Sequence, residues 1–163
     1  MAPVPESDVD LLVDFLNTVD EDEGTDELAD DAACTAWFRD HGLAGRRDEV
    51  GATTARALRT ALRQSADEVP RPPQLPDIPL EVVLDGDGRP TLSSTHPLGA
   101  LIISAVRLDL EDRWRRIKLC HMETCRYAYY DGSRNTSGRW CSMKVCGNRA
   151  KTRAFRERHR DEV

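Results

Sequence analysis

The spacing of apolar residues predicts that the first two thirds of the chain is mostly helical. The clearest stripe lies between residues 97 and 117, where apolar side chains recur at three- and four-residue steps. Its members are Ile102, Val106, Leu110, Trp114 and Ile117. We therefore expect one amphipathic helix across this range, closing a core built by the helices before it.

Three shorter helices are predicted upstream of that stripe. The first is built on Leu12, Phe15, Leu16 and Val19, and the acidic run 20–26 with its glycine ends it. The second is built on Leu28, Ala32, Ala36 and Trp37 and stops at His41 and Gly42, because glycine commonly terminates helices. The third covers about 48–68 and ends before Pro70.

Between the third and fourth helices the pattern changes from helical to extended. Residues 70–79 hold five prolines and predict an extended connector. Two β-prone runs follow, 80–84 and 89–93, separated by Asp-Gly-Asp-Gly, which predicts a hairpin. Pro90 lacks an amide hydrogen and therefore restricts the second strand to the edge of a sheet.

Four of the five cysteines stand in two C-x4-C pairs, Cys120 with Cys125 and Cys141 with Cys146. Two matched pairs supply four thiolates for one tetrahedral zinc ion, and four cysteines close the site to water, so the zinc is structural. We also considered His121 as a substitute ligand and unliganded buried cysteines as the alternative. The fifth cysteine, Cys34, lies among small apolar residues and is expected to be buried.

The region around the cysteine pairs predicts a small module with few apolar residues. Residues 126–131 alternate as a strand, 132–140 form a polar turn, and a helix follows Cys141. The predicted fold class is therefore α+β, mostly α: a helical N-terminal domain with a β-hairpin (1–115) and a C-terminal treble-clef-like zinc module (116–163). Zinc must contribute most of the folding free energy of so small a module.

The net charge of −6 hides an uneven distribution of charge. Residues 113–160 carry 14 Lys and Arg against 3 Asp and Glu, whereas the remainder carries 9 against 26. A basic patch of this kind is suited to the phosphates of DNA. The candidate contacts are Arg134, Arg139, Lys144, Arg149, Lys151, Arg153, Arg156 and Arg160. The alternative is that the basic helix faces solvent or the acidic half of the same protein.

Other classes of protein receive little support from the sequence. No apolar run approaches the ~20 residues that span a bilayer, and the first residues lack the features of a signal peptide, so we expect a cytoplasmic protein that does not enter a membrane. No catalytic motif accompanies the polar residues Asp14, Asn17, His41 and His96, so we expect no enzyme. Asn17, which faces partly inward on the first helix, is the candidate contact for a small-molecule ligand.

The segment C-S-M-K-V-C-G-N-R-A-K (141–151), with Trp140 before it and C-H-M-E-T-C upstream, resembles the CGNR zinc-finger family. The opening L-V-D-F-L-N-T (12–18) is similar to the start of the ABATE domain that precedes this finger in the family, described as a stress-induced transcription regulator. The resemblance implies zinc on the four paired cysteines and DNA binding by the finger.

Together these observations predict a zinc-containing, DNA-binding transcription regulator whose N-terminal domain senses a ligand or forms a homodimer. The alternative is a zinc-stabilised protein-interaction module without sequence-specific DNA binding. The sequence leaves open whether the basic helix meets DNA or the protein's own acidic domain.

Overall fold

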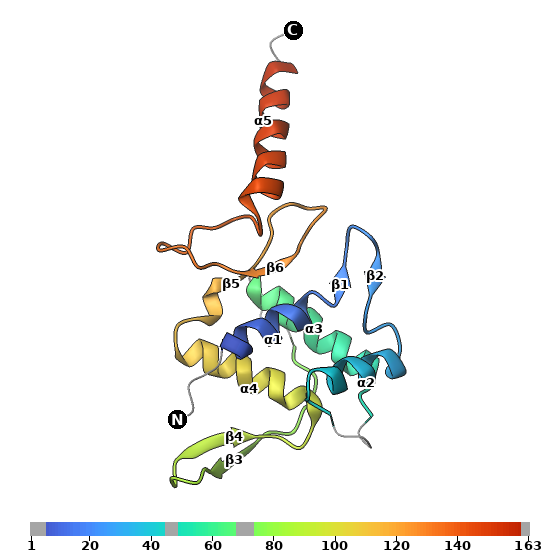
Figure 1. Ribbon diagram of the computed structural model, residues 1–163, viewed down its shortest axis with the longest axis vertical. Helices are drawn as coiled ribbons and strands as arrows, with labels where there is room; N and C mark the ends of the chain where they lie inside the picture. The colour runs from blue at the N-terminus through green and yellow to red at the C-terminus, as the bar shows by residue number, and fades with distance from the viewer. Residues whose placement is uncertain (1–5, 45–48, 68–73, 161–163) are drawn as a thin grey trace.

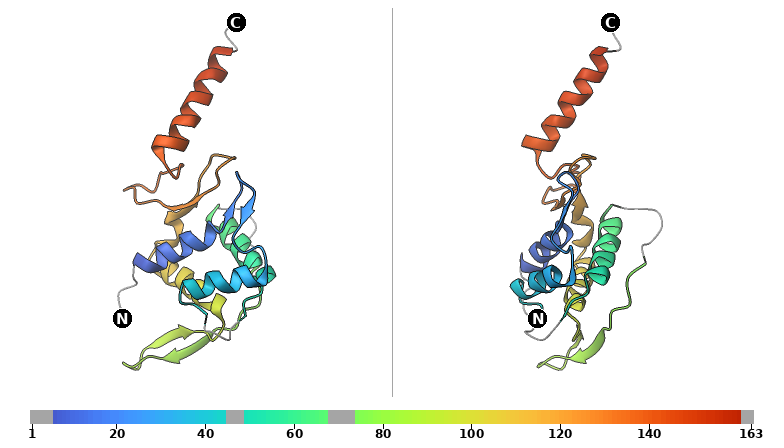
Figure 2. Two further views of the ribbon diagram at one scale, coloured as in Figure 1. Left: turned by 45° about the vertical axis from the view of Figure 1, so that its right-hand side comes forward. Right: turned by 90° about the vertical axis from the view of Figure 1, so that its right-hand side faces the viewer.

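The computed structural model describes residues 6–44, 49–67 and 74–160, and it shows a helical body from which one helix projects (Figures 1 and 2). The helices are α1 (Glu6–Leu16), α2 (Asp31–Asp40), α3 (Ala52–Ala66), α4 (Pro97–Leu110) and α5 (Asn148–Arg160). The strands are β1 (Val19–Asp20), β2 (Thr25–Asp26), β3 (Glu81–Leu84), β4 (Pro90–Ser93), β5 (Ile117–Leu119) and β6 (Ala128–Tyr130). Each strand pairs antiparallel with its neighbour in the chain, giving three small hairpins. The predicted fold class is confirmed.

The core lies where α1, α3 and α4 pack together, with α2 covering one side. Leu12, Phe15 and Leu16 of α1 are completely buried, as the helical spacing predicted. Phe15 meets Trp37 and Phe38 of α2 with ring centroids 5.6 and 6.1 Å apart. Burial of each large side chain stabilises the fold by roughly 1.5–3 kcal/mol, so this aromatic cluster fixes α2 against α1.

The first strand of the zinc module is part of the same core. Ile117 and Leu119 of β5 and Ala128 of β6 are buried together with the residues of α1 and α3. The change of charge near residue 115 therefore does not coincide with a break in the apolar packing. The predicted boundary at 115/116 remains a prediction, but the packing that crosses it is continuous.

The predicted fourth helix ends earlier than the stripe indicated. Asp112 has a positive φ of 59°, and the Arg113 amide donates to the Leu108 carbonyl at 2.8 Å, which closes the helix as a Schellman-type cap. Leu110, predicted to face the core, is consequently 82% exposed. Trp114 lies in a separate 3-10 turn, η1 (Trp114–Arg116), that leads into β5.

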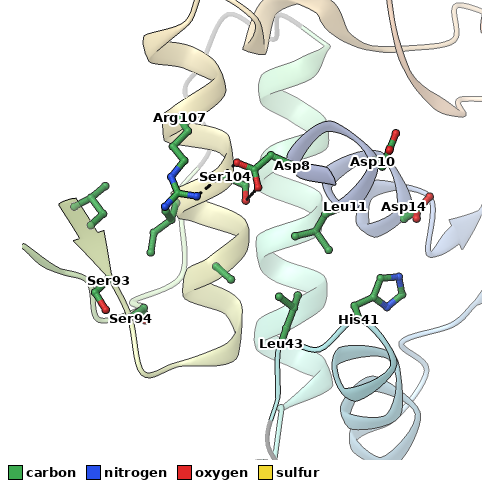
Figure 3. A pocket seen from close by; sticks show the side chains of 13 residues that line it. Asp8, Asp10, Leu11, Asp14, His41, Leu43, Ser93, Ser94, Ser104 and Arg107 are labelled. Atoms are coloured by element: carbon green, nitrogen blue, oxygen red, sulfur yellow. Dashed lines mark hydrogen bonds and ion pairs between the residues drawn. The ribbon is translucent and has the colours of Figure 1, made fainter. Parts of the chain in front are cut away.

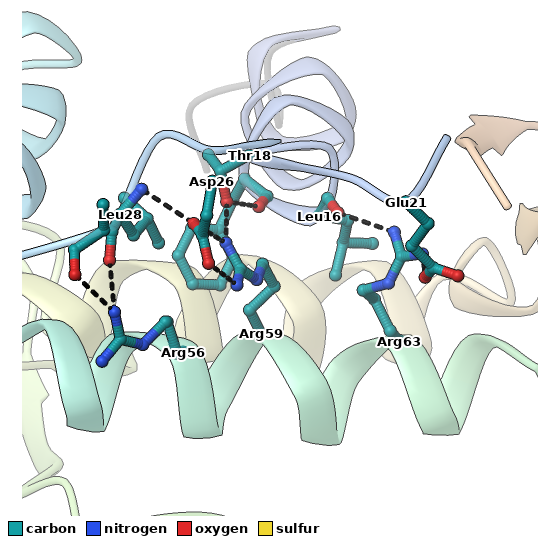
Figure 4. A network of polar contacts seen from close by, with 10 residues as sticks. Leu16, Thr18, Glu21, Asp26, Leu28, Arg56, Arg59 and Arg63 are labelled. Atoms are coloured by element: carbon teal, nitrogen blue, oxygen red, sulfur yellow. Dashed lines mark hydrogen bonds and ion pairs between the residues drawn. The ribbon is translucent and has the colours of Figure 1, made fainter. Parts of the chain in front are cut away.

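A ladder of arginines on α3 holds the acidic segment that follows α1 (Figure 4). Arg59 is only 5% exposed; it donates two hydrogen bonds of 2.7 Å to the Asp26 carboxylate and one to the Thr18 hydroxyl. One turn further, Arg63 donates to the Leu16 carbonyl and to Glu21. The hydrophobic pattern predicted only that this acidic segment ends the first helix. In the structure the segment forms the β1–β2 hairpin, which is bound to α3.

Candidate metal centre and the basic helix

The four paired cysteines meet at one point of the structure, although they are spread over 27 residues of sequence. Their four sulfur atoms lie within 4.8 Å of one another, and the Sγ atoms of Cys125 and Cys146 are each 3.7 Å from that of Cys141. This spacing is too long for a disulfide bond. Tetrahedral zinc with bonds of about 2.3 Å requires sulfur atoms about 3.8 Å apart, so the cluster fits one zinc ion.

Two backbone devices bring the cysteines together. The β5–β6 hairpin presents Cys120 and Cys125 on the turn between its strands, where Arg126 adopts a positive φ of 48°. Cys146 lies in a π-helical turn, η2 (Met143–Gly147), directly before α5. A β-carbon on Gly147 would stand 2.9 Å from the Met143 sulfur and 3.3 Å from the Trp140 ring, so this glycine lets both side chains pack closely against the turn.

Among the described residues, no histidine takes part in the cluster. His121 adjoins Cys120, but its ring packs edge-on against Trp140 with centroids 6.1 Å apart. With four thiolates around the ion, no position is left for water or substrate, and the zinc supplies structure and no chemistry.

An ion pair orders the long loop between the two cysteine pairs. The Lys118 ammonium group donates to Asp131 at 2.8 Å and also to the carbonyls of Thr136 and Gly138. Asp131, 4% exposed, in turn accepts the amide hydrogens of Ser133 and Gly138. These hydrogen bonds hold the pKa of Asp131 well below its usual range despite burial. The loop that carries Arg134 and Arg139 is therefore tied to β5.

Helix α5 extends away from the rest of the molecule and starts at the metal centre (Figures 1 and 2). Its described basic side chains are exposed, and Arg149, Arg153 and Arg156 line one shallow hollow along the helix with Lys144. Lys151 is exposed on the same helix, and Arg134 and Arg139 are exposed on the loop. The side chain of Arg160 lies outside the described residues. The structure thus gathers seven of the eight predicted contacts at one end of the molecule.

The described part of the acidic half, residues 6–44, 49–67 and 74–112, does not cover α5. The ion pair described on α5 is internal, between Arg153 and Glu157 at 3.1 Å. The acidic groups Asp26 and Glu21 instead pair with Arg59 and Arg63 of α3. This pairing argues against the alternative in which the basic helix binds its own N-terminal domain.

Asn17 joins the two parts of the molecule and is not available as the predicted ligand contact. Its amide nitrogen donates to the Ala128 carbonyl at 2.9 Å, and its oxygen accepts the Ala128 amide hydrogen at 2.7 Å. Arg63 reinforces this contact with a 2.9 Å hydrogen bond to the Arg126 carbonyl. No pattern in the sequence indicates this role, because Asn17 and Ala128 are 111 residues apart.

A hollow of about 700 Å³ lies between α1, α4, β4 and the end of α2 (Figure 3). Asp8 and Ser104 are its buried polar groups. One carboxylate oxygen of Asp8 accepts the Ser104 hydroxyl at 2.9 Å, and the other has no hydrogen-bond partner among the described residues. Arg107 stands 3.7 Å from that second oxygen. Asp10 and Asp14 add negative charge, whereas Leu11 and Ile103 add apolar surface.

The other polar residues considered for catalysis have structural contacts. The His41 ring stacks on Trp37 at 3.7 Å and bonds to the Trp37 carbonyl, and the His96 ring accepts the Leu98 amide at the start of α4. Burial raises the pKa of the Cys34 thiol to about 11, which leaves it unreactive near neutral pH. Among the described residues, no helix has the length and apolar character needed to cross a membrane.

Comparison with known families agrees with this geometry. A family model described as "CGNR zinc finger" matches residues 116–159, and the ABATE model, described as "Putative stress-induced transcription regulator", matches residues 10–110. The resemblance found in the sequence is thereby confirmed, and with it one structural zinc ion in the C-terminal module. A search of curated proteins gives no significant match.

Proposed function

Because the chain belongs to the ABATE family and ends in a CGNR zinc finger, we propose that it is a transcription regulator that binds duplex DNA through α5. The projection of α5 is the observation that carries this proposal. A helix fits the major groove of DNA, about 12 Å wide, only if neighbouring elements leave it clear, and α5 extends beyond every other element (Figure 2). We assign no chemical reaction to the protein.

The basic residues of α5 and of the loop 132–140 have complementary roles in this proposal. Arg149, Arg153 and Arg156 follow one face of the helix, so they can contact successive phosphates along one side of a groove. Arg139 lies 5.8 Å from the Trp140 ring centroid, which restrains its guanidinium group beside the zinc centre. The Lys118–Asp131 pair holds the loop in place for these contacts.

The double variant Arg149→Gln with Arg156→Gln is expected to bind duplex DNA about tenfold more weakly, or weaker still. The slope of log K against log salt should fall by about 2, because two phosphate contacts are lost. Fluorescence anisotropy over a salt series measures both quantities. Arg89→Gln with Arg115→Gln is the matched control, because it removes the same charge from exposed positions elsewhere.

Two results would count against DNA binding by α5. The first is equal weakening in the control pair, which would indicate a diffuse charge effect. The second is binding to duplex no tighter than to a random polyanion. That second result favours the zinc-stabilised protein-interaction module as the function.

We place the sensing role in the hollow around Asp8, with an organic cation as the class of ligand. One oxygen of Asp8 accepts no hydrogen bond, and its ion-pair partner Arg107 stands 3.7 Å away. The acidic residues of the hollow outnumber Arg107 and favour a further positive charge. The apolar side chains Leu11 and Ile103 suit a short hydrocarbon part.

Butylammonium is therefore expected to raise the melting temperature of the protein at millimolar concentration, because a ligand that binds only the native state stabilises it. Butyrate, of matching size and opposite charge, should not. In the Asp8→Asn variant, butylammonium is expected to cause no rise above the melting temperature of that variant alone. Asp22→Asn, at an exposed position, is the control and is expected to keep the rise. An equal shift from both compounds contradicts this assignment.

A further inference from the structure

The β3–β4 hairpin extends from the body at the end opposite α5 (Figures 1 and 2). Its apolar side chains are exposed. Leu80, directly before β3, and Val82 and Leu84 within it follow the two-residue period of one strand face and are 37%, 73% and 69% exposed. All four residues of β3 are exposed. A two-stranded hairpin with this composition is marginally stable alone in water, so the hairpin is a surface that another strand would stabilise.

The hydrogen-bond register identifies which backbone groups of β3 are free. The Asp85 amide donates to the Arg89 carbonyl at 2.9 Å, which makes these two residues a hydrogen-bonded pair. Bonded pairs alternate in an antiparallel ladder, and with the observed pairing Val83 and Glu81 therefore bond to β4. The N–H and C=O groups of Val82 and Leu84 point away from β4, toward the free edge.

This edge lacks the features that normally prevent strands from pairing. Edge strands are commonly protected by proline, lysine or a bulge, but β3 reads Glu-Val-Val-Leu with none of these. Proline occurs instead at Pro90 in β4. The unprotected strand of the hairpin is therefore β3.

We propose that β3 is the dimer interface of this protein: it pairs antiparallel with β3 of a second copy, so that the two hairpins form one four-stranded sheet. A two-fold axis places one residue opposite its own symmetry mate, and residues at equal distances before and after it then face each other across the axis. The free groups of Val82 and Leu84 restrict which of these registers can form hydrogen bonds. In the register centred on Val82, the two Val82 residues face each other and Leu80 faces Leu84 of the second copy.

Charge selects this register over its neighbours. With Val82 on the axis, Glu81 lies opposite Val83 and no acidic group of the strand faces another. Shifting the axis to Glu81 places two Glu81 carboxylates opposite each other, and shifting it to Val83 places Glu81 opposite Asp85. Like charges directly opposite destabilise a sheet. The β3 strand of a second copy is thus a better partner for this edge than an arbitrary strand, because in this register its apolar residues face each other and its acidic residues do not.

The test begins with the oligomeric state of the full zinc-loaded chain. Sedimentation velocity at tens of micromolar protein is expected to show a dimer for the wild type and for Val82→Thr, which keeps the outward N–H. Val82→Pro removes that N–H without removing a bond between β3 and β4, and a monomer is expected. Circular dichroism checks that this variant keeps its helices.

A cysteine pair tests the register and does not depend on the proline variant folding. Position 82 lies on the axis, where Cα atoms of a bonded pair are about 5.5 Å apart, within the reach of a disulfide. Val82→Cys is therefore expected to form a covalent dimer on mild oxidation, whereas Glu81→Cys, which faces Val83, is not. Zinc occupies the four clustered thiols, and Cys34 is buried.

A monomeric wild type at these concentrations overturns the proposal, and so does a dimer that Val82→Pro leaves intact. Cross-linking at both cysteine positions would show contact without the stated register and would also overturn it. None of these measurements involves DNA, so they succeed or fail independently of the role proposed for α5.

Discussion

Cys146→Ser is expected to abolish stoichiometric zinc binding and to unfold α5 while the body of the molecule remains helical. Three ligands cannot hold the ion as four do, and zinc contributes on the order of 10 kcal/mol to modules of this size. The body has its own packed core of α1, α3 and α4. The circular dichroism signal at 222 nm should fall by about the share of one 13-residue helix, and duplex binding should be lost.

The matched control for this experiment is Cys34→Ala, which removes a cysteine that lies outside the metal cluster. We expect it to keep one zinc ion per chain and full DNA affinity, with a modest loss of stability from the cavity. Chelation of zinc from the wild type should reproduce the Cys146→Ser result. The opposite result is unfolding of all helices on chelation. It would show that the core of the body cannot form without the residues that the zinc module adds, which are Ile117, Leu119 and Ala128.

Arg59→Met is expected to lower the free energy of unfolding by about 3 kcal/mol, because it leaves Asp26 and Thr18 without their shared partner. The Asp26 side chain is 27% exposed in the folded protein. The expected loss of stability is therefore at the lower end of the range for breaking a buried ion pair. Urea denaturation measures the change. Arg158→Met on the exposed face of α5 is the control and should shift the midpoint little.

The same variant should change the response of the protein to acid. The hydrogen bond from Arg59 lowers the pKa of Asp26 below its usual value. A lowered native pKa stabilises the fold above the unfolded pKa of about 4, and this stabilisation is lost as the pH falls through the native value. The wild type should therefore lose more stability than Arg59→Met between pH 5 and pH 2. Parallel curves for the two proteins would rule out the Asp26–Arg59 pair as the source.

The local features of the fold could be predicted from sequence because they depend on short-range rules. Helical periodicity located α1, α2, α3 and α4, and the Asp-Gly-Asp-Gly turn located the β3–β4 hairpin. The two C-x4-C pairs located the metal centre, since only a metal ion brings four thiols so close in a module with so little core.

Features that depend on long-range contacts were not predictable in the same way. Leu110 fits the stripe of α4, but the cap at Asp112 turns the chain away before this side chain can be buried. The arginines of α3 at positions 56, 59 and 63 share one helix face, and that spacing was the available signal for the segment they bind. Arg59 and Arg63 pair with acidic residues of the β1–β2 hairpin, and Arg56 donates to the carbonyls of Leu28 and Ala29 just after it. The sequence suggested Asn17 as a ligand contact because its partner is the backbone of Ala128, and a backbone partner cannot be recognised from side-chain types.

The position of α1 has a mechanical consequence. This helix is about 16 Å long at 1.5 Å per residue; Asp8 and Leu11 on it line the hollow, and Asn17, just beyond its end, grips the backbone of β6 through two hydrogen bonds. One helix of the packed core therefore connects the hollow to the β5–β6 hairpin that carries Cys120 and Cys125.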